Sequence, residues 1–207
     1  MRRGAALIAA GAALLLAAPS FAAPPKGEDP DWPCQQRMVP VLGAATYWSG
    51  PPIEEDGDWT AEPRIAALVQ EIAPRQVPAE QGEAAITTFA DSLGTGDDKK
   101  KLLTLVFSGL LAETNRQRAE IIARLKELGH RQHELADIAS HAGEELQTIP
   151  PDATGEAAAR RADLEQRFTF VTQAFTSTQR TMRYACDIPV QLDARLGRYA
   201  RALQARL

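Results

Sequence analysis

Histidine and carboxylate side chains gather in one stretch of the chain, where they could bind a metal ion. All three histidines lie within twelve residues, at positions 130, 133 and 141. His133, Asp137 and His141 follow one another at intervals of four, so a helix places them on one face. Imidazole and carboxylate are suitable ligands for zinc or copper. Because eight residues of helix rise by about 12 Å, a single ion at this face needs ligands from a second chain.

The alternative for this stretch is a solvated polar face, and on that interpretation the protein binds no cofactor. Other chemistry finds little support in the sequence. It contains no serine in a nucleophile-elbow motif, no glycine-rich phosphate loop and no HExxH metal motif. We therefore expect a protein that is not an enzyme.

The N-terminal residues have the pattern of a secretory signal peptide. Two arginines follow Met1, an alanine-rich apolar stretch comes next, and Ser20-Phe21-Ala22 supplies small residues for cleavage before Ala23. We expect residues 1–22 to be removed and the mature chain to be periplasmic or secreted. No later stretch has the roughly 20 apolar residues of a transmembrane helix, so no membrane insertion is expected after signal removal.

The two cysteines of the chain, Cys34 and Cys186, are expected to form a disulfide, because exported proteins fold under oxidising conditions. The formal net charge of the full chain is −4, with 27 acidic residues against 23 Lys and Arg. This mild acidity, with the two signs intermixed, gives no electrostatic reason to bind nucleic acid.

Residues 23–59 form a segment that is rich in proline and tryptophan. The prolines and an Asp-Gly-Asp turn leave little room for a helix, so the segment is expected to be extended. It also holds Trp32, Trp48 and Trp59, which a disordered linker would not. Two interpretations remain open: Trp32 and Trp48 contact a partner protein, or the rings cover an apolar helical surface to which Cys34 tethers them.

Residues 60–207 are expected to form an all-α domain with a small helical base. One helix is predicted from about Thr60 to Pro74, a second over 79–93, and a long third beginning with Asp97 or Asp98 as its cap. The last helix is predicted to follow Pro189. Its apolar stripe is Leu192, Leu196, Tyr199 and Leu203, and its arginines Arg195, Arg198, Arg201 and Arg206 are predicted to face outward.

Two arms, 121–149 and 156–186, are predicted to form a long antiparallel coiled-coil hairpin that projects from the base, because the prolines at 150 and 151 interrupt the helix between them. Apolar positions recur at alternating steps of four and three, the spacing of a coiled-coil seam. Antiparallel pairing across the turn matches nine positions of each arm. The outgoing arm contributes Ile121, Leu125, Leu128, Gln132, Leu135, Ala139, Ala142, Leu146 and Ile149, and the returning arm contributes Ala185, Met182, Thr178, Phe175, Val171, Phe168, Leu164, Arg161 and Ala157, in the same order.

Ile138 and Phe170 are apolar but lie off this seam on adjoining arms. Exposed apolar side chains at matching levels favour a contact patch or a dimer face. The expected partner is an envelope protein that the sequence does not identify, or a second copy of the chain in a homodimer.

The opening Asp31-Trp32-Pro33-Cys34-Gln35 resembles the start of uncharacterised exported proteobacterial proteins with a DWPCxQ segment, and this resemblance implies no activity. The architecture is similar to that of periplasmic helical-hairpin metal sensors and chaperones of the CpxP and Spy type, whose LTxxQ signature is absent here. The sequence as a whole favours an exported, non-catalytic helical protein with an accessory or scaffold role in the cell envelope. The rival is a periplasmic metal-binding or metal-sensing protein.

Overall fold

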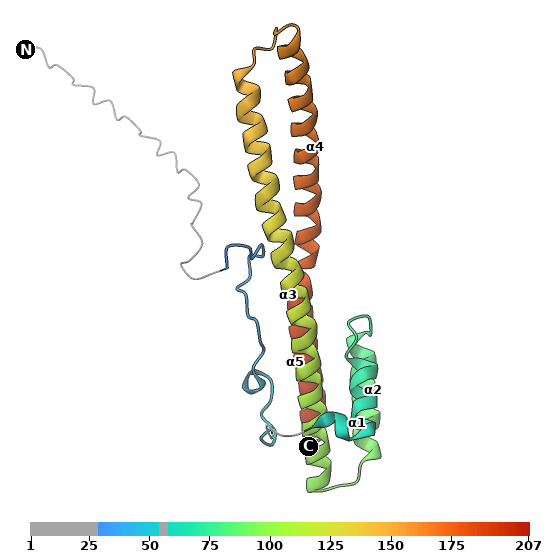
Figure 1. Ribbon diagram of the computed structural model, residues 1–207. Helices are drawn as coiled ribbons and strands as arrows, with labels where there is room; N and C mark the ends of the chain where they lie inside the picture. Colours follow the sequence, from blue (N-terminus) through green and yellow to red (C-terminus); the bar gives the residue numbers. More distant parts are fainter. Residues whose placement is uncertain (1–28, 54–57) are drawn as a thin grey trace, which may run out of the picture.

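The computed structural model describes residues 29–53 and 58–207, so the predicted signal peptide at 1–22 lies outside the described residues. The described chain is all-helical and contains no strand, which confirms the predicted fold class (Figure 1). Five α-helices carry the fold: α1 Pro63–Ile72, α2 Ala79–Ser92, α3 Asp97–Thr148, α4 Glu156–Ala185 and α5 Asp187–Gln204. Two short 3-10 helices precede them, at Ala44–Thr46 and Trp59–Ala61. None of the described helices is long and apolar enough to cross a membrane.

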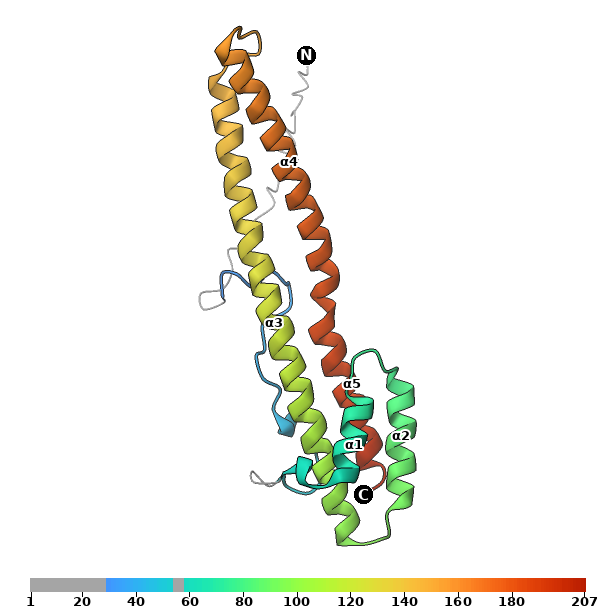
Figure 2. The ribbon, with the colours of Figure 1, turned by 45° about the vertical axis from the view of Figure 1, so that its right-hand side comes forward.

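The helix α3 runs through the whole molecule, from the base to the far end of the arm (Figures 1 and 2). Its N-cap is Gly96, at a φ of 103°, so the prediction that Asp97 or Asp98 caps it was wrong. Both aspartates instead lie in the first turn, where a carboxylate stabilises the positive end of the helix dipole. The helix stops at Thr148, and Gly155, at a φ of 62°, leads into α4, which confirms the predicted turn.

Helices α4 and α5 form one nearly continuous rod that returns from the tip of the arm into the base (Figure 2). Cys186 between them has helical dihedral angles, φ −63° and ψ −24°. The hydrogen-bond pattern breaks here because Pro189 has no N–H to donate to the Ala185 carbonyl. The last helix therefore begins at Asp187, with Pro189 in its first turn, and not after Pro189 as the sequence suggested.

The seam between α3 and α4 follows the predicted pairing. Gln132 Nε2 donates to the Phe175 carbonyl at 3.3 Å, and Arg161 Nη1 donates to the carbonyls of Leu146 at 3.1 Å and Ile149 at 2.6 Å. The register places Gln132 opposite Phe175 and Leu146 opposite Arg161, and Ile149 is the next predicted seam position after Leu146. Six predicted seam residues are buried: Leu125, Gln132, Ala142, Leu164, Val171 and Met182. All nine seam positions of the outgoing arm, eight on α3 and Ile149 just after it, are half-buried or buried, so this arm presents its seam inward throughout.

Two predicted seam positions on α4 differ from the expectation. Ala157 is exposed, and the Phe168 side chain is 37% exposed. Phe168 lies against Gly143, where an added Cβ would be 3.5 Å from the ring. Because glycine offers no side chain to cover the ring, Phe168 packs at the edge of the seam and keeps part of its surface in solvent.

The base is closed by helices α1, α2 and α5 around the lower part of α3. Its core is apolar and almost inaccessible, and it consists mainly of Ile65, Leu68, Val69, Ile72, Ile86, Ala90, Leu103, Val106, Phe107, Leu110, Leu196, Tyr199, Ala200 and Leu203. This set includes three residues of the predicted stripe of α5, Leu196, Tyr199 and Leu203, and the fourth, Leu192, is also buried. Burial of one such side chain contributes roughly 1.5–3 kcal/mol, and most of the buried apolar side chains among the described residues belong to this core.

Arg195 is buried at 9% exposure, so the prediction that it faces outward was wrong. Its Nη1 donates to the Pro74 carbonyl at 2.7 Å and its Nη2 to the Ala73 carbonyl. These carbonyls lie just beyond the end of α1, where no helical N–H is available to bond them. The planar guanidinium caps both at once, and burial lowers the pKa of Arg195.

Replacing Arg195 by Met should lower the free energy of unfolding by about 1–2 kcal/mol, because the carbonyls of Ala73 and Pro74 lose a charged donor and keep only the Gln117 amide and the Val77 N–H. Urea denaturation followed by circular dichroism measures the change. The matched control is Arg201→Met on the exposed side of the same helix, for which a change within about 0.5 kcal/mol is expected. Equal effects of the two substitutions would contradict the capping role of Arg195.

Candidate functional site

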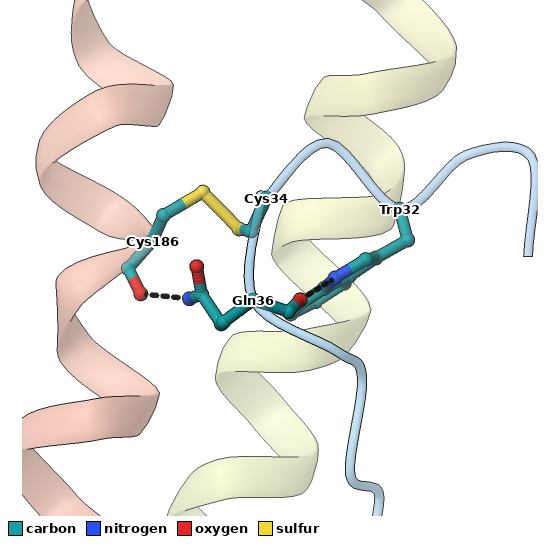
Figure 3. Close-up of a disulfide and its surroundings, with 4 residues drawn as sticks. All are labelled: Trp32, Cys34, Gln36 and Cys186. Carbon is teal, nitrogen blue, oxygen red and sulfur yellow. Dashed lines mark hydrogen bonds between the residues drawn. A yellow bond between two sulfur atoms is a disulfide. The ribbon is translucent and has the colours of Figure 1, made fainter. Parts of the chain in front are cut away.

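The Cys34–Cys186 disulfide ties the N-terminal segment to the junction of α4 and α5 (Figure 3). It confirms the predicted bond, with 5.6 Å between the two Cα atoms and 152 residues between the cysteines. Gln36 Nε2 donates to the Cys186 carbonyl at 2.5 Å, and Trp32 Nε1 donates to the Gln36 carbonyl at 2.7 Å. Covalent bond and hydrogen bonds together hold residues 32–36 between the two arms at their root.

Beyond the disulfide, the segment lies directly on α3. Lys126 Nζ pairs with Asp29 Oδ2 at 2.7 Å, and this contact lowers the pKa of Asp29. An added Cβ at Gly129 would lie only 2.0 Å from the Asp31 carbonyl oxygen. The missing side chain at Gly129 is therefore what lets the backbone of the segment approach the helix so closely.

The three histidines do not form one site. His130 Nδ1 and His133 Nδ1 each lie 3.5 Å from Asp31 Oδ1, whereas His141 Nδ1 lies 3.8 Å from Glu144 Oε2. In residues 29–53 and 58–207 no three histidine, cysteine or acidic side chains are grouped closely enough to hold a metal ion. The predicted set His133, Asp137 and His141 is therefore not brought together within one chain, in agreement with the helix-rise argument. Contact of Asp31 with two of the histidines was not predicted from the sequence.

The tryptophans of the segment have different environments. Trp48 is only 9% exposed, stacks on Phe107 with 4.6 Å between ring centroids, and donates its Nε1 to the Pro51 carbonyl at 2.8 Å. Trp48 is thus part of the base core. Of the two interpretations of the sequence, contact with a partner protein is therefore excluded for Trp48. Trp32 is half-buried, and its ring helps to line a small cavity at the root of the hairpin.

This root cavity has a volume of about 150 Å³ and lies between the tethered segment, α3 and α5. Its lining consists of Trp32, Gln36, Arg37, Val39, Arg118, Ile122, Pro189, Val190 and Asp193. Arg118, only 4% exposed, donates Nη1 to the Pro189 carbonyl at 2.5 Å and Nη2 to the Val39 carbonyl at 2.8 Å. Burial lowers the pKa of its guanidinium, which still remains charged.

Asp193 on the cavity wall is tied to the segment by Tyr47, whose hydroxyl donates to Asp193 Oδ1 at 2.7 Å. Burial, together with the Asp193 carboxylate, raises the pKa of Tyr47 to about 12. Sequence reasoning missed Arg118, although the seam spacing gave a signal. The seam alternates steps of four and three, from Leu125 to Ile121 and then to Arg118. Arg118 is therefore a seam position, and a charged residue at a seam position predicts a buried polar contact.

The middle of α4 carries a second distinctive surface, residues 168–179, which we call the uncharged band. It contains no acidic residue, lysine, arginine or histidine, although charged residues make up 24% of the chain. Eight of its twelve residues are exposed: Phe168, Thr169, Phe170, Thr172, Gln173, Thr176, Ser177 and Gln179. The Phe170 ring is 71% exposed, and Ile138 on the neighbouring arm is half-buried.

Arginines flank the uncharged band on both sides. Arg167 precedes it, Arg180 and Arg183 follow it, and residues 166–185 include no acidic side chain. Within the described residues, none of these three arginines makes an ion pair. This stretch of α4 is therefore neutral in the middle and positive at both ends.

Comparisons of the chain with protein-family models, with curated proteins and with solved structures found no match.

Substituting Gly129 by Ala should detach the start of the tethered segment from α3, because the new methyl group would overlap the Asp31 carbonyl. Hydrogen exchange of residues 29–36, measured by mass spectrometry on oxidised protein, should become faster. Gly143→Ala is the matched control, since its Cβ would meet only Phe168 at an ordinary contact distance of 3.5 Å. It should leave the exchange unchanged and stabilise the helix by about 1 kcal/mol. Unchanged exchange in Gly129→Ala would contradict the close contact.

Proposed function

We propose that this protein is an exported, non-catalytic accessory or scaffold protein of the cell envelope, which binds a partner protein through the outer face of its hairpin arm. The observation that carries the proposal is the uncharged band of α4. Solvent-exposed helix faces are normally rich in charge, whereas the centres of protein interfaces are depleted in it and enriched in aromatic side chains. The eight exposed residues share two features with an interface centre, the lack of charge and the exposed aromatic rings of Phe168 and Phe170.

The size and chemistry of the band favour a helical partner. Twelve residues of α-helix span about 18 Å, and the threonines, serine and alanine within the band are small enough for a second helix to pack closely. The arginines at both ends favour carboxylates at the rim of the partner. We therefore describe the partner as a helix with an uncharged face about three turns long, flanked by acidic residues.

Charge also bears on the choice between another envelope protein and a homodimer. If α4 packed antiparallel on α4 of a second copy, centred on the uncharged band, Arg167 of each chain would face Arg180 of the other. Like charges placed opposite each other weaken such a contact. The electrostatics thus favour a different protein over a second copy.

Export is supported by the signal-peptide pattern at residues 1–22, together with a disulfide that is compatible with a periplasmic or extracellular location. The rival function, metal binding or sensing through His133, Asp137 and His141, requires a second chain to complete the ligand set. No contact among the described residues favours it, and so we do not propose it.

A photo-crosslinking side chain at position 170 or 172 should form one discrete adduct in the native envelope, because both positions lie in the proposed interface. The same group at Ala159 or Ala162, which are exposed on α4 but outside the uncharged band, should not. The double change Arg167→Glu and Arg180→Glu should reduce the adduct at least tenfold, equivalent to about 1.4 kcal/mol of binding free energy. Adduct yield is measured by immunoblot.

Two results would contradict the proposal. Equal adducts at positions 159, 162, 170 and 172 would mean that the band is not a preferred contact. An adduct that contains only a second copy of this chain, identified by mass spectrometry, would mean a homodimer and not an envelope partner.

A further inference from the structure

The uncharged band is small for a stable protein interface. Only eight of its residues are exposed, whereas a specific interface takes roughly 20–30 residues from each side. Given the proposed function, on which this inference rests, a stably bound partner also contacts a neighbouring surface. Because the band lies in the middle of a helical rod, that surface is either toward the tip of the arm or toward the base.

Toward the tip, the surface of α4 does not resemble the band. Residues 160–167 include five charged side chains: Arg160, Arg161, Asp163, Glu165 and Arg167. Three of the five already have partners, since Arg160 pairs with Glu145 and Arg161 pairs with Glu165. Surface ion pairs of this kind contribute little free energy, so this direction offers a partner neither apolar contact nor a set of unpaired charges.

Toward the base, the outward face of the rod leads to an exposed aromatic ring. Steps of four residues lead from Thr176 in the band through Arg180 to Tyr184, so these side chains share one face of the helix. Tyr184 is 74% exposed, and tyrosine is one of the residues enriched in protein interfaces. Met182 is buried in the seam on the other side of the helix, so this face points away from α3.

Beyond Tyr184 the same face enters a groove, which we call the base groove, between α5 and the loop that joins α1 to α2 (Figure 2). The groove has a volume of about 630 Å³ and is lined by residues 75–79 and by α5 residues between 188 and 198. Val77 and Ile188 on its walls are half-buried and Pro78 is exposed, so apolar surface remains accessible. The groove and Tyr184 bring the surface to the size of a specific interface.

The charge along this surface favours an acidic partner. No acidic side chain lines the base groove. Arg198 in the groove is neutralised by two glutamates of α2, but Arg75 is exposed and makes no ion pair within the described residues. Arg183, next to Tyr184, is exposed and unpaired as well, and Asp187 is the one acidic residue between positions 166 and 192. Unpaired arginines beside apolar surface attract carboxylates.

We propose that the partner helix bound at the uncharged band continues along the rod, over Tyr184 and into the base groove. There its apolar side chains contact Val77 and Ile188, and its carboxylates pair with Arg75 and Arg183. Between positions 172 and 191 the contact covers about 28 Å of the rod, at about 1.5 Å per residue. The partner segment is therefore a helix of roughly 19 residues or more, whose part over the base is apolar and flanked by acidic residues.

Photo-crosslinking side chains at positions 172, 184 and 191, placed one at a time in the full chain in the native envelope, test this continuation. All three should form adducts with one protein. Mass spectrometry of the crosslinked peptides should place the residues joined to positions 172 and 191 about 19 positions apart in its sequence. Val190 is the control, because it is 53% exposed on the same helix but lines the root cavity. It should give no adduct.

The crosslinks distinguish failure of this continuation from failure of the proposed function. An adduct at position 172 with none at 184 and 191 would overturn the continuation and leave the proposed function standing. Absence of an adduct at 172 would overturn both. Adducts at 172 and 191 with two different proteins, or an adduct at 191 with a second copy of this chain, would also overturn the continuation.

Charge reversal tests the acidic character of the partner segment. The double change Arg75→Glu and Arg183→Glu should reduce the adduct at position 191 at least about tenfold, because like charges would then face each other. Arg64→Glu combined with Arg124→Glu is the matched control, since it changes the net charge equally at exposed arginines outside this surface. The control should leave the adduct unchanged, and equal losses in the two double variants would overturn the pairing with Arg75 and Arg183.

Discussion

The disulfide between Cys34 and Cys186 is the constraint on which the arrangement around the root of the hairpin depends. It joins an extended, proline-rich segment to the point where Pro189 interrupts the returning rod. The segment has no regular secondary structure over most of its length, so its backbone can satisfy only a few of its hydrogen bonds internally. Its position is fixed instead by contacts with side chains of the helices, and the covalent bond keeps these contacts within reach of one another.

The base and the arm bury their apolar side chains in different ways. The base buries a continuous apolar core under three short helices, and Trp48 of the extended segment completes it by stacking on Phe107. The arm has only one partner surface, its own seam, and so most of its residues remain in solvent. A helix pair of this kind stays soluble through charge on its outer faces, which is why an exposed stretch without charge on α4 points to a function and not to folding.

The parts of the fold that could be predicted from the sequence are those set by local patterns. Alternating steps of three and four specify the seam, and two prolines specify the turn, whatever the rest of the chain does. Arg195 and Trp48 could not be placed in this way, and for Arg118 the spacing indicates a buried position but not its hydrogen-bond partners. Their environments depend on carbonyls and rings that are distant in sequence: the end of α1, Pro189, and Phe107. The contact of Asp31 with His130 and His133 likewise joins residues about 100 positions apart, which meet where the tethered segment lies on α3.

The junction at Cys186 also determines how the arm would respond to a mechanical load. A helical rod bends most easily where its hydrogen-bond ladder is broken, and Pro189 places this weak point where α4 enters the base. The disulfide and the Gln36 side chain brace the same point from outside. With the joint braced, a force applied near the tip would turn the arm as a lever and reach the base as a torque.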